Sequence, residues 1–407
     1  MKVAIVNEGL AYPPTAGNWL RTLNLMLPLA ARHDITYVCR GTRDAKANAN
    51  AKAFYAERGI RALISRDHPA PNRGVKFYGR LAANLFSPYP YSIAAHRSAQ
   101  VRRTIRDLAA TEAIDLWQFE TISYADTLAG TSSRTLVMAH NVESLIWKRL
   151  HETEASAPKR WYIGHQWRKY ERFEARVLRA ADCVVAVSAE DAALMRHRFG
   201  VRQTAVVDNG VDIAHFDGGA TPAARDARQV LFLGSLEWRP NLDSVDRLLG
   251  EIMPAVRATE PGARLCIVGR NPPASLVRRV RDEPQVELHA DVPDVRPWLA
   301  RAGMLAVPLR IGGGSRLKIL EAAAAGLPVV STRIGCEGLT FVADRDLRVV
   351  ESTSEMAAAI VALMRRPEDG AALARNARSV VDAYYDWSRL ANRLEAVWLE
   401  TVSASGR

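Results

Sequence analysis

The feature that most constrains the fold is an alternation, along almost the whole chain, of short apolar β-rich runs with longer helical patterns. Parallel strands need a crossover of a dozen or more residues, usually a helix, so this alternation predicts parallel sheets covered by helices. The expected strands are Val3–Asn7, Ile35–Cys39, Thr135–His140, Cys183–Ser188, Thr204–Val207, Val230–Gly234, Arg264–Gly269, Val286–His289, Met304–Pro308, Val329–Thr332 and Leu347–Val350. The clearest helical patterns are Leu20–Arg32, Val101–Ala110, Tyr170–Ala181 and Asp243–Ala258.

The chain has 407 residues, more than one α/β core usually holds, so we expect two domains. Residues 216–228 are rich in Gly, Ala, Asp and Pro without clear periodicity, which favours a linker before the apolar run that begins at Val230. The predicted domains are residues 1–212 and 213–383, followed by an aromatic-rich helix over about 384–407. Two doubly wound domains fit this pattern better than one barrel.

The most informative segment is LAVPLRIGGGSRLKILEAAAAGLP at residues 305–328. It predicts a buried strand, a glycine loop and a helix that Gly326 ends. The N–H groups and dipole of a helix N-terminus favour anions, and helical spacing places Lys318 and Glu321 on one face. This arrangement offers a cation for phosphate and a carboxylate for sugar hydroxyls. The alternative is a tight turn followed by an exposed Lys–Glu pair.

Several small or polar residues follow predicted strands, where ligands of open α/β sheets bind. His140 follows one such strand, and Gly234, Ser235 and Gly269 follow two others. If two domains face each other, we expect these strand ends to line one cleft between them.

Composition indicates a globular protein that is not built around disulfides. The hydrophobic share is 48% and the charged share 24%, as in soluble domains. The four cysteines are far apart, so neither a CxxC metal pair nor a disulfide framework is indicated. No apolar run approaches the roughly 18 residues of a membrane span, and the N-terminus does not resemble a signal peptide. We expect a reducing, cytoplasmic location.

The net charge of +11 is concentrated partly in two stretches that mix basic and aromatic residues. The first runs from Arg73 to Arg106 and carries no acidic residue, and the second contains Lys159, Arg160, Trp161, Lys169 and Tyr170 among others. Such stretches suit an anionic membrane surface or nucleic acid. The alternative is a solvated helix face over ordinary core aromatics.

The chain resembles the retaining glycosyltransferases of family four, which have the GT-B architecture of two facing Rossmann-like domains. The resemblance spans most of the chain and rests on the order and spacing of individually weak motifs. These are PPTAGNWLR near the start, MAHNVES at 138–144, AVSAED at 186–191, DNGVD at 208–212, LGSLEWRPN at 233–241, IVGRNP at 267–272, ADVPDVRPWLA at 290–300 and VPLRIGGGSRLKILEAAAAGLPVVST from residue 307.

The resemblance implies a nucleotide-sugar donor site in the C-terminal domain. Glu321 matches the second glutamate of the family's Glu-x7-Glu motif, which binds ribose hydroxyls, whereas Gly313 stands where the first glutamate would be. The family's diphosphate-binding arginine and lysine would fall on Ser235 and Pro240, so both charges are missing. The expected donor-binding set is Gly17, Ser235, Arg239, Gly269, Gly312, Gly313, Gly314, Ser315, Arg316, Lys318 and Glu321.

Arg239, Arg316 and Lys318 are the nearby cations that would replace the missing pair. Arg316 suits bidentate phosphate contact and Lys318 a point charge. His140 matches a histidine at the edge of the acceptor domain that contacts the donor sugar in relatives, and Gly17 matches one glycine of the N-terminal loop, with Arg21 as an added charge.

The resemblance implies transfer to a saccharide or lipid-linked acceptor with retention of configuration, as in cell-surface polysaccharide or glycolipid synthesis. The expected catalytic residues are His140, Arg316, Lys318 and Glu321. We expect no cofactor beyond the donor and no obligatory metal, because Asp291 and Asp294 read as turn and helix-cap residues. The N-terminal domain, joined by the final helix, is expected to bind the acceptor and to meet an anionic membrane rather than nucleic acid.

Other readings stay open at this stage. A nucleotide-sugar epimerase would convert the donor without an acceptor, and a phosphorylase would need a cofactor bound to a lysine. A degenerate protein acting as a scaffold is favoured by the missing charges and opposed by His140, Lys318 and Glu321.

Overall fold

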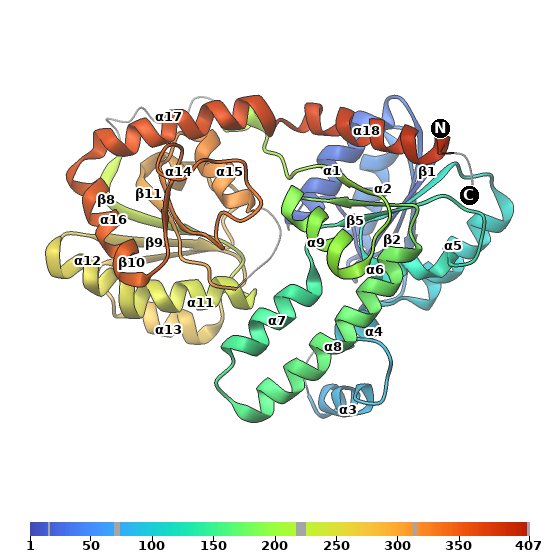
Figure 1. The fold of residues 1–407 in the computed structure, drawn as a ribbon, viewed down its shortest axis with the longest axis horizontal. Coiled ribbons are helices and arrows are strands. Elements are labelled where there is room, and N and C mark those ends of the chain that lie inside the picture. Colours follow the sequence, from blue (N-terminus) through green and yellow to red (C-terminus); the bar gives the residue numbers. More distant parts are fainter. Residues whose placement is uncertain (15–16, 69–73, 217–224, 312–315, 405–407) are drawn as a thin grey trace. The chain divides into compact units, whose positions relative to one another are not determined.

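The computed structural model describes residues 1–14, 17–68, 74–216, 225–311 and 316–404 (Figure 1). The chain divides into two compact units, one formed by Met1–Asp208 with Ser388–Arg407 and the other by Asn209–Trp387. Each unit contains its own parallel sheet, and we call them the first and the second unit.

The sheet of the first unit has the strand order β3-β2-β1-β4-β5-β6-β7, with every neighbouring pair parallel. Helices cover both of its faces, so its central strands are buried almost throughout, as expected for a parallel sheet. The strands are β1 (Lys2–Asn7), β2 (Asp34–Arg40), β3 (Ile60–Ser65), β4 (Leu116–Phe119), β5 (Thr135–Ala139), β6 (Cys183–Ala186) and β7 (Thr204–Val206).

Two of these strands were not among those expected from the sequence. β3 lies at the sheet edge and interrupts its apolar run with the exposed Arg61. β4 is only 4 residues long and contains Gln118. Both are therefore weak signals for a method that looks for apolar runs.

Helices precede and follow these strands as the alternation predicts. They are α1 (Gly17–Ala30), α2 (Ala45–Ala56), α3 (Val75–Asn84), α4 (Tyr91–His96), α5 (Ala99–Thr111), α6 (Ile122–Ala125), α7 (Glu143–Thr153), α8 (Ala157–Ala180) and α9 (Ala189–Phe199). The C-terminal helix α18 (Trp387–Ser403) also packs on this unit. The expected start of this helix at residue 384 was wrong, since Tyr384 ends the preceding helix, α17 (Pro367–Tyr384).

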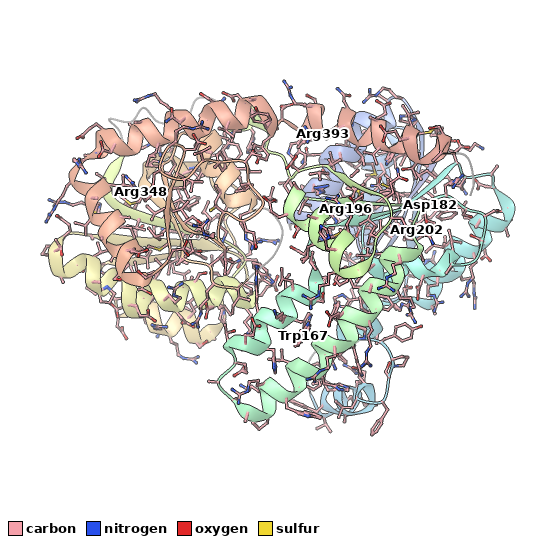
Figure 2. All side chains as sticks on the ribbon, in the orientation of Figure 1. Trp167, Asp182, Arg196, Arg202, Arg348 and Arg393 are labelled. Carbon is pink, nitrogen blue, oxygen red and sulfur yellow. The ribbon has the colours of Figure 1, made fainter. Side chains whose placement is uncertain are left out.

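Specific contacts fix α18 against the first unit. The indole Nε1 of the buried Trp398 donates to Gln118 Oε1 at 2.6 Å. Arg393, labelled in Figure 2, forms an ion pair with Asp208 at 2.8 Å. The end of the chain therefore supports the sheet at β4.

Helices α7 and α8 form a hairpin, and α3 lies against α8 (Figure 1). Trp167 of α8 meets the His151 ring of α7 with centroids 5.8 Å apart (Figure 2). Lys169 Nζ donates to the Leu85 carbonyl at 3.2 Å. Lys169 and Tyr170 are buried, so the interpretation of these two residues as part of a basic–aromatic surface was wrong.

The sheet of the second unit has the strand order β10-β9-β8-β11-β12-β13 and is also parallel throughout. Its strands are β8 (Asp226–Leu233), β9 (Arg264–Gly269), β10 (Val286–Ala290), β11 (Ala302–Val307), β12 (Val329–Thr332) and β13 (Arg348–Val350). Its helical segments are α10 (Ile213–Phe216), α11 (Arg239–Arg247), the π-helical η3 (Leu248–Ile252), α12 (Met253–Thr259), α13 (Ala274–Arg281), α14 (Arg296–Arg301), α15 (Leu317–Ala324), α16 (Thr353–Arg365) and α17.

The expected linker over residues 216–228 was too long at its C-terminal end. β8 begins at Asp226 and pairs there with Ala302 of β11. Residues 217–224 lie outside the described residues. Across the part of the chain that the structure describes, no helix is long and apolar enough to cross a membrane.

Candidate active site

Lys318 lies at the start of α15, beyond the carboxyl end of β11. Its Nζ donates to Asn241 Oδ1 at 2.9 Å and lies 4.4 Å from the ring centroid of Phe232 in β8. The helix stops where the sequence predicts, since Gly326 adopts a left-handed φ of 66°. The short helix thus holds Lys318 at the strand ends of the second unit.

Asn241, which sequence reasoning missed, connects this lysine to the turn after β8. It lies in the first turn of α11, is buried, and donates from Nδ2 to the Ser235 carbonyl at 2.9 Å. An amide in this place fixes the ammonium of Lys318 without neutralising it. Its only sequence signal was its position beside Pro240 at a helix start.

Burial dominates the electrostatics of Lys318 and Glu321. It lowers the pKa of Lys318 to about 7, an effect that the charge of Arg316 reinforces and that of Glu321 opposes. Burial raises the pKa of Glu321 to about 7 against the opposing charge of Lys318. Burial thus disfavours the charged form of each group, and an added anion would favour the charged form of Lys318.

Gly234 and Gly269 allow the strand ends to approach closely. A Cβ at Gly269 would lie 2.1 Å from the Gly234 carbonyl oxygen, and one at Gly234 would lie 2.9 Å from Lys318 Nζ. Neither position has room for a larger residue. Gly269, expected in the donor-binding set, therefore has a packing role that is visible in the structure.

The remaining residues expected around the donor fall in three groups. Arg316 is buried and occupies the N-cap position of α15 without a capping hydrogen bond from its side chain to any described residue, and Arg239 is exposed at the start of α11. Ser235 has its hydroxyl 3.4 Å from Glu237. Gly312, Gly313, Gly314 and Ser315 lie outside the described residues.

In the first unit, His140 follows β5 and faces a buried carboxylate. Its Nε2 lies 3.2 Å from Glu120 Oε2, and the same carboxylate oxygen accepts from Thr22 Oγ1 at 2.7 Å. Gln118 Nε2 donates to the other oxygen. Burial alone would raise the pKa of Glu120, but the contacts of His140, Thr22 and Gln118 outweigh it and hold the pKa below its ordinary value.

Sequence reasoning missed Glu120, because it recognised no strand before it. The carboxylate keeps its charge in the interior through its hydrogen bonds, as a buried charge must. It also fixes which nitrogen of His140 points inward. Nδ1 is then the nitrogen of His140 that is directed away from Glu120.

Two residues of α1 differ from each other in role. Gly17 is its first residue and is exposed. Arg21, expected to add charge near the donor, is buried and donates to the Val207 carbonyl at 2.7 Å and the Asp208 carbonyl at 3.2 Å. Burial lowers its pKa to about 10. Arg21 therefore braces β7 and the segment that follows it.

Candidate metal ligands were also located. Asp291 Oδ1 accepts from the Asn271 N–H at 2.9 Å and so joins the segment after β10 to the segment after β9. Asp294 Oδ1 accepts from the Arg296 N–H at 3.0 Å and stabilises a local turn. Among the described residues, Cys266, Glu287 and His289 have ligand atoms within 4.8 Å of one another. Burial raises the pKa of the Cys266 thiol to about 12, which disfavours the thiolate that binds metal.

Two family models match successive parts of the chain. The model described as "Glycosyltransferase Family 4" matches residues 20–215. The model described as "Glycosyl transferases group 1" matches residues 227–366. Together they cover all strands of the first sheet except β1, and nearly the whole sheet of the second unit.

The curated relatives match a smaller share of the chain than the two family models together. A glycogen synthase of Mycobacterium tuberculosis is 25% identical over 299 residues, which cover 70% of this chain and 69% of that protein. A GDP-mannose-dependent monoacylated alpha-(1-6)-phosphatidylinositol monomannoside mannosyltransferase of Corynebacterium glutamicum is 29% identical over 208 residues, covering 46% of this chain and 53% of that protein.

Solved structures share the fold. Anabaena Alr3699/HepE in complex with UDP superposes with a TM-score of 0.66 at 15% identity, covering 98% of this chain and 100% of that one. Sucrose-phosphate synthase of Thermosynechococcus elongatus gives 0.72 at 17% identity, covering 99% of each chain. These likenesses, with the two parallel sheets, confirm the predicted α/β class of two Rossmann-like domains.

Proposed function

The chain belongs to glycosyltransferase family four, with the GT-B fold, and from this premise we propose that it transfers a sugar from a nucleoside-diphosphate sugar to a saccharide or lipid-linked acceptor with retention of configuration. The second unit binds the donor, and the first unit, with α18, binds the acceptor. The proposed product is part of a cell-surface polysaccharide or glycolipid.

The observation that carries the proposal is the state of Lys318. It is held by Asn241 at a helix start beyond β11, and burial lowers its pKa to about 7. A diphosphate at this edge supplies the missing counter-charge and receives charge stabilisation as it departs. Anabaena Alr3699/HepE, whose fold is shared, was solved with UDP bound.

Arg316 and Arg239 are the further cations proposed for the diphosphate, and Glu321 is proposed to accept hydrogen bonds from ribose hydroxyls. Glu321 lies one helical turn after Lys318 on α15, so one helix face serves both parts of the nucleotide. Ionisation of Glu321 is favoured when hydroxyl donors reach it.

The transfer step needs no protein nucleophile. The acceptor oxygen bonds to the anomeric carbon while the bond from that carbon to the diphosphate breaks, and the acceptor proton passes to the leaving phosphate. Lys318 and Arg316 stabilise the departing charge, and His140 binds the transferred sugar through Nδ1 while Glu120 holds Nε2. We propose that no metal and no further cofactor take part.

A membrane-facing surface is proposed at the end of the α7–α8 hairpin with α3. Its apolar side chains are unusually exposed, with Phe86 at 93%, Val75 at 89%, Tyr78 at 67% and Trp161 at 61%. Basic residues on the same helices include Lys76, Arg80, Lys159, Arg160 and Arg168. Exposed aromatic rings among cations suit an anionic bilayer, so we propose a cytoplasmic enzyme that docks peripherally.

A thermal-shift panel of nucleotides and nucleotide sugars tests the donor proposal, because a ligand that binds only the folded protein raises its unfolding temperature. We expect a stabilising nucleoside diphosphate for the wild type and a much smaller shift for Lys318→Met. If no nucleotide stabilises the wild type, the donor site is elsewhere or absent. Turnover with the stabilising nucleotide sugar then distinguishes a transferase from a scaffold.

A further inference from the structure

A cavity lies on the carboxyl edge of the sheet in the first unit. It has a volume of about 610 Å³ and opens beyond β1 and β2, with Glu8, Arg40, Arg43, His68 and His96 in its lining. This size is that of ordinary small-ligand sites, which span about 300–1,000 Å³. Its floor adjoins the His140 network, because Thr121, which donates to Glu8 at 3.0 Å, directly follows Glu120.

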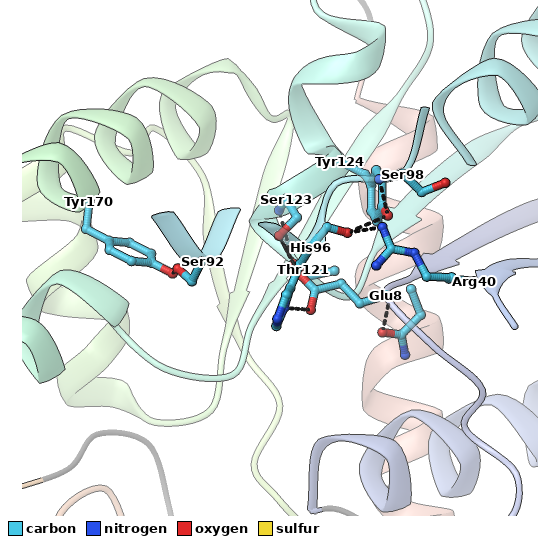
Figure 3. A network of polar contacts seen from close by, with 10 residues as sticks. Glu8, Arg40, Ser92, His96, Ser98, Thr121, Ser123, Tyr124 and Tyr170 are labelled. Carbon is cyan, nitrogen blue, oxygen red and sulfur yellow. Dashed lines mark hydrogen bonds and ion pairs between the residues drawn. The ribbon is translucent and has the colours of Figure 1, made fainter. Parts of the chain in front are cut away.

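Glu8, the one carboxylate among the described residues of the lining, is already engaged (Figure 3). Its carboxylate accepts hydrogen bonds from Thr121 and Ser123 and lies 3.1 Å from His96 Nδ1. Burial raises its pKa, but the contacts of His96, Ser123 and Thr121 outweigh burial and lower it overall. Glu8 therefore acts as a fixed anion that orients His96, and it is poorly placed to repel a bound anion.

The cations of the lining are less completely neutralised. Arg40 is buried, donates from Nη2 to the His96 carbonyl at 2.6 Å, and has its Nε 3.7 Å from Asp67, with no hydrogen bond to Nε among the described residues. Arg43 is exposed at the cavity rim. Glu8 and Asp67 both carry negative charge beside Arg40 and His96, so the positive excess lies on Arg43 at the rim, where it favours an anion.

One wall of the cavity is aromatic. The Trp19 ring lies over Gly9, where a Cβ would come within 3.2 Å of Trp19 Cζ2. Tyr12 stacks on Phe54 with ring centroids 3.6 Å apart, and its N–H donates to the Tyr55 hydroxyl at 3.0 Å. Rigid ring faces carry negative charge that attracts the polarised C–H groups of a sugar. A flat polyhydroxylated ligand fits such a wall.

We infer that this cavity is the acceptor site and that the acceptor is an anionic saccharide or polyol, with its phosphate or carboxylate on Arg43 and Arg40 and its ring against Trp19. The inference rests on the proposed function and specifies its acceptor. Arg43 supplies the planar fork that matches either anion in a bidentate contact. His96 presents its remaining nitrogen to a ligand hydroxyl or anion oxygen while Glu8 holds Nδ1.

Calorimetric binding to the full chain tests this inference with three matched probes: glucose, glucose 6-phosphate and glucuronate, each at millimolar concentration with UDP present. We expect the anionic probes to bind at least about tenfold more tightly than glucose. Preference for glucose 6-phosphate or for glucuronate identifies the anion as phosphate or carboxylate.

Variants localise the effect. Arg43→Gln should weaken anionic probes about tenfold and leave glucose unchanged, whereas Arg106→Gln, an exposed arginine of α5 outside the lining, should change neither. Arg43→Lys should recover part of the loss. Equal binding of neutral and anionic probes, no binding of any probe, or an unaffected Arg43→Gln variant would overturn the inference. UDP binding, measured in the same cell, separates this failure from failure of the donor proposal.

Discussion

Glu120 in the first unit and Lys318 in the second are both charged groups at the carboxyl edge of a parallel sheet, but Glu120 is buried, Lys318 is partly buried, and their surroundings differ. Glu120 contacts three side chains, Thr22, Gln118 and His140, and its pKa stays below the ordinary value. Lys318 has an amide partner, Asn241, and burial lowers its pKa to about 7. Burial raises the pKa of Glu321, on the same helix, to about 7.

The difference suggests that the two edges are prepared in different ways. The hydrogen bonds around Glu120 are complete within the protein, so they position His140 before any substrate arrives. Burial disfavours the charged forms of Lys318 and Glu321. A bound diphosphate and ribose would favour these charged forms and so offset the cost of desolvation. On the proposed function, the first edge positions His140, whereas the charge state of the second edge depends on the bound donor.

The largest effect is expected from removing the charge of Lys318. Lys318→Met keeps the length of the side chain and should lower kcat/KM for transfer by about 10²–10³-fold, as loss of one oxyanion donor does. The thermal unfolding midpoint should stay the same or rise, because a desolvated amine is removed. Arg333→Met is a matched control, since Arg333 is an exposed residue of the second unit paired with Glu351. Near-normal turnover of Lys318→Met would remove Lys318 from the mechanism.

A paired substitution compares the buried carboxylate of Glu120 with the partly buried carboxylate of Glu321. Glu120→Gln should destabilise the protein by about 1–3 kcal/mol, because it replaces one accepting oxygen by an NH2 group that faces other donors. Glu321→Gln should leave stability nearly unchanged at neutral pH and mainly weaken donor binding. Equal losses of thermal midpoint in both variants would show that the two edges do not differ.

The same pair gives a pH dependence with a definite sign. The pKa of Glu321 is raised to about 7, so its contribution to stability is present below the unfolded value and is lost as the pH rises through about 7. The Glu321→Gln variant has no carboxyl group at this position, so its stability does not fall with pH for this reason. The midpoint of Glu321→Gln minus that of the wild type should therefore increase from about pH 5 to about pH 8. A flat difference would contradict the raised pKa.

The smallest effect is expected at the proposed membrane surface. The double variant with Phe86→Ser and Trp161→Ser should reduce binding to anionic vesicles to about a tenth of the wild-type value. Transfer to a soluble acceptor should be unchanged. Leu399→Ser is the control, because Leu399 is an exposed apolar residue of α18. Unchanged flotation with vesicles at low salt would rule this surface out.

Sequence patterns predicted most of the fold. At each candidate site they also predicted some of the residues, but not the partners that these residues contact. The alternation located the sheets, and helical spacing placed Lys318 beside Glu321 on α15. The partners of these residues were missed for a physical reason. Thr22 meets Glu120 across 98 positions and Asn241 meets Lys318 across 77, and no local period encodes such contacts. β4 was also too short and too polar to be recognised, so Glu120 had no strand to follow.

The most direct test of the account is proton uptake when UDP binds at pH 8, measured by calorimetry in two buffers of different ionisation enthalpy. At this pH, Lys318 with a pKa of about 7 is mostly neutral, Glu321 is mostly ionised, and a phosphate with a second pKa of about 6 is already charged. The account predicts net uptake approaching one proton in the wild type and none in Lys318→Met. UDP binding without proton exchange in the wild type would contradict it.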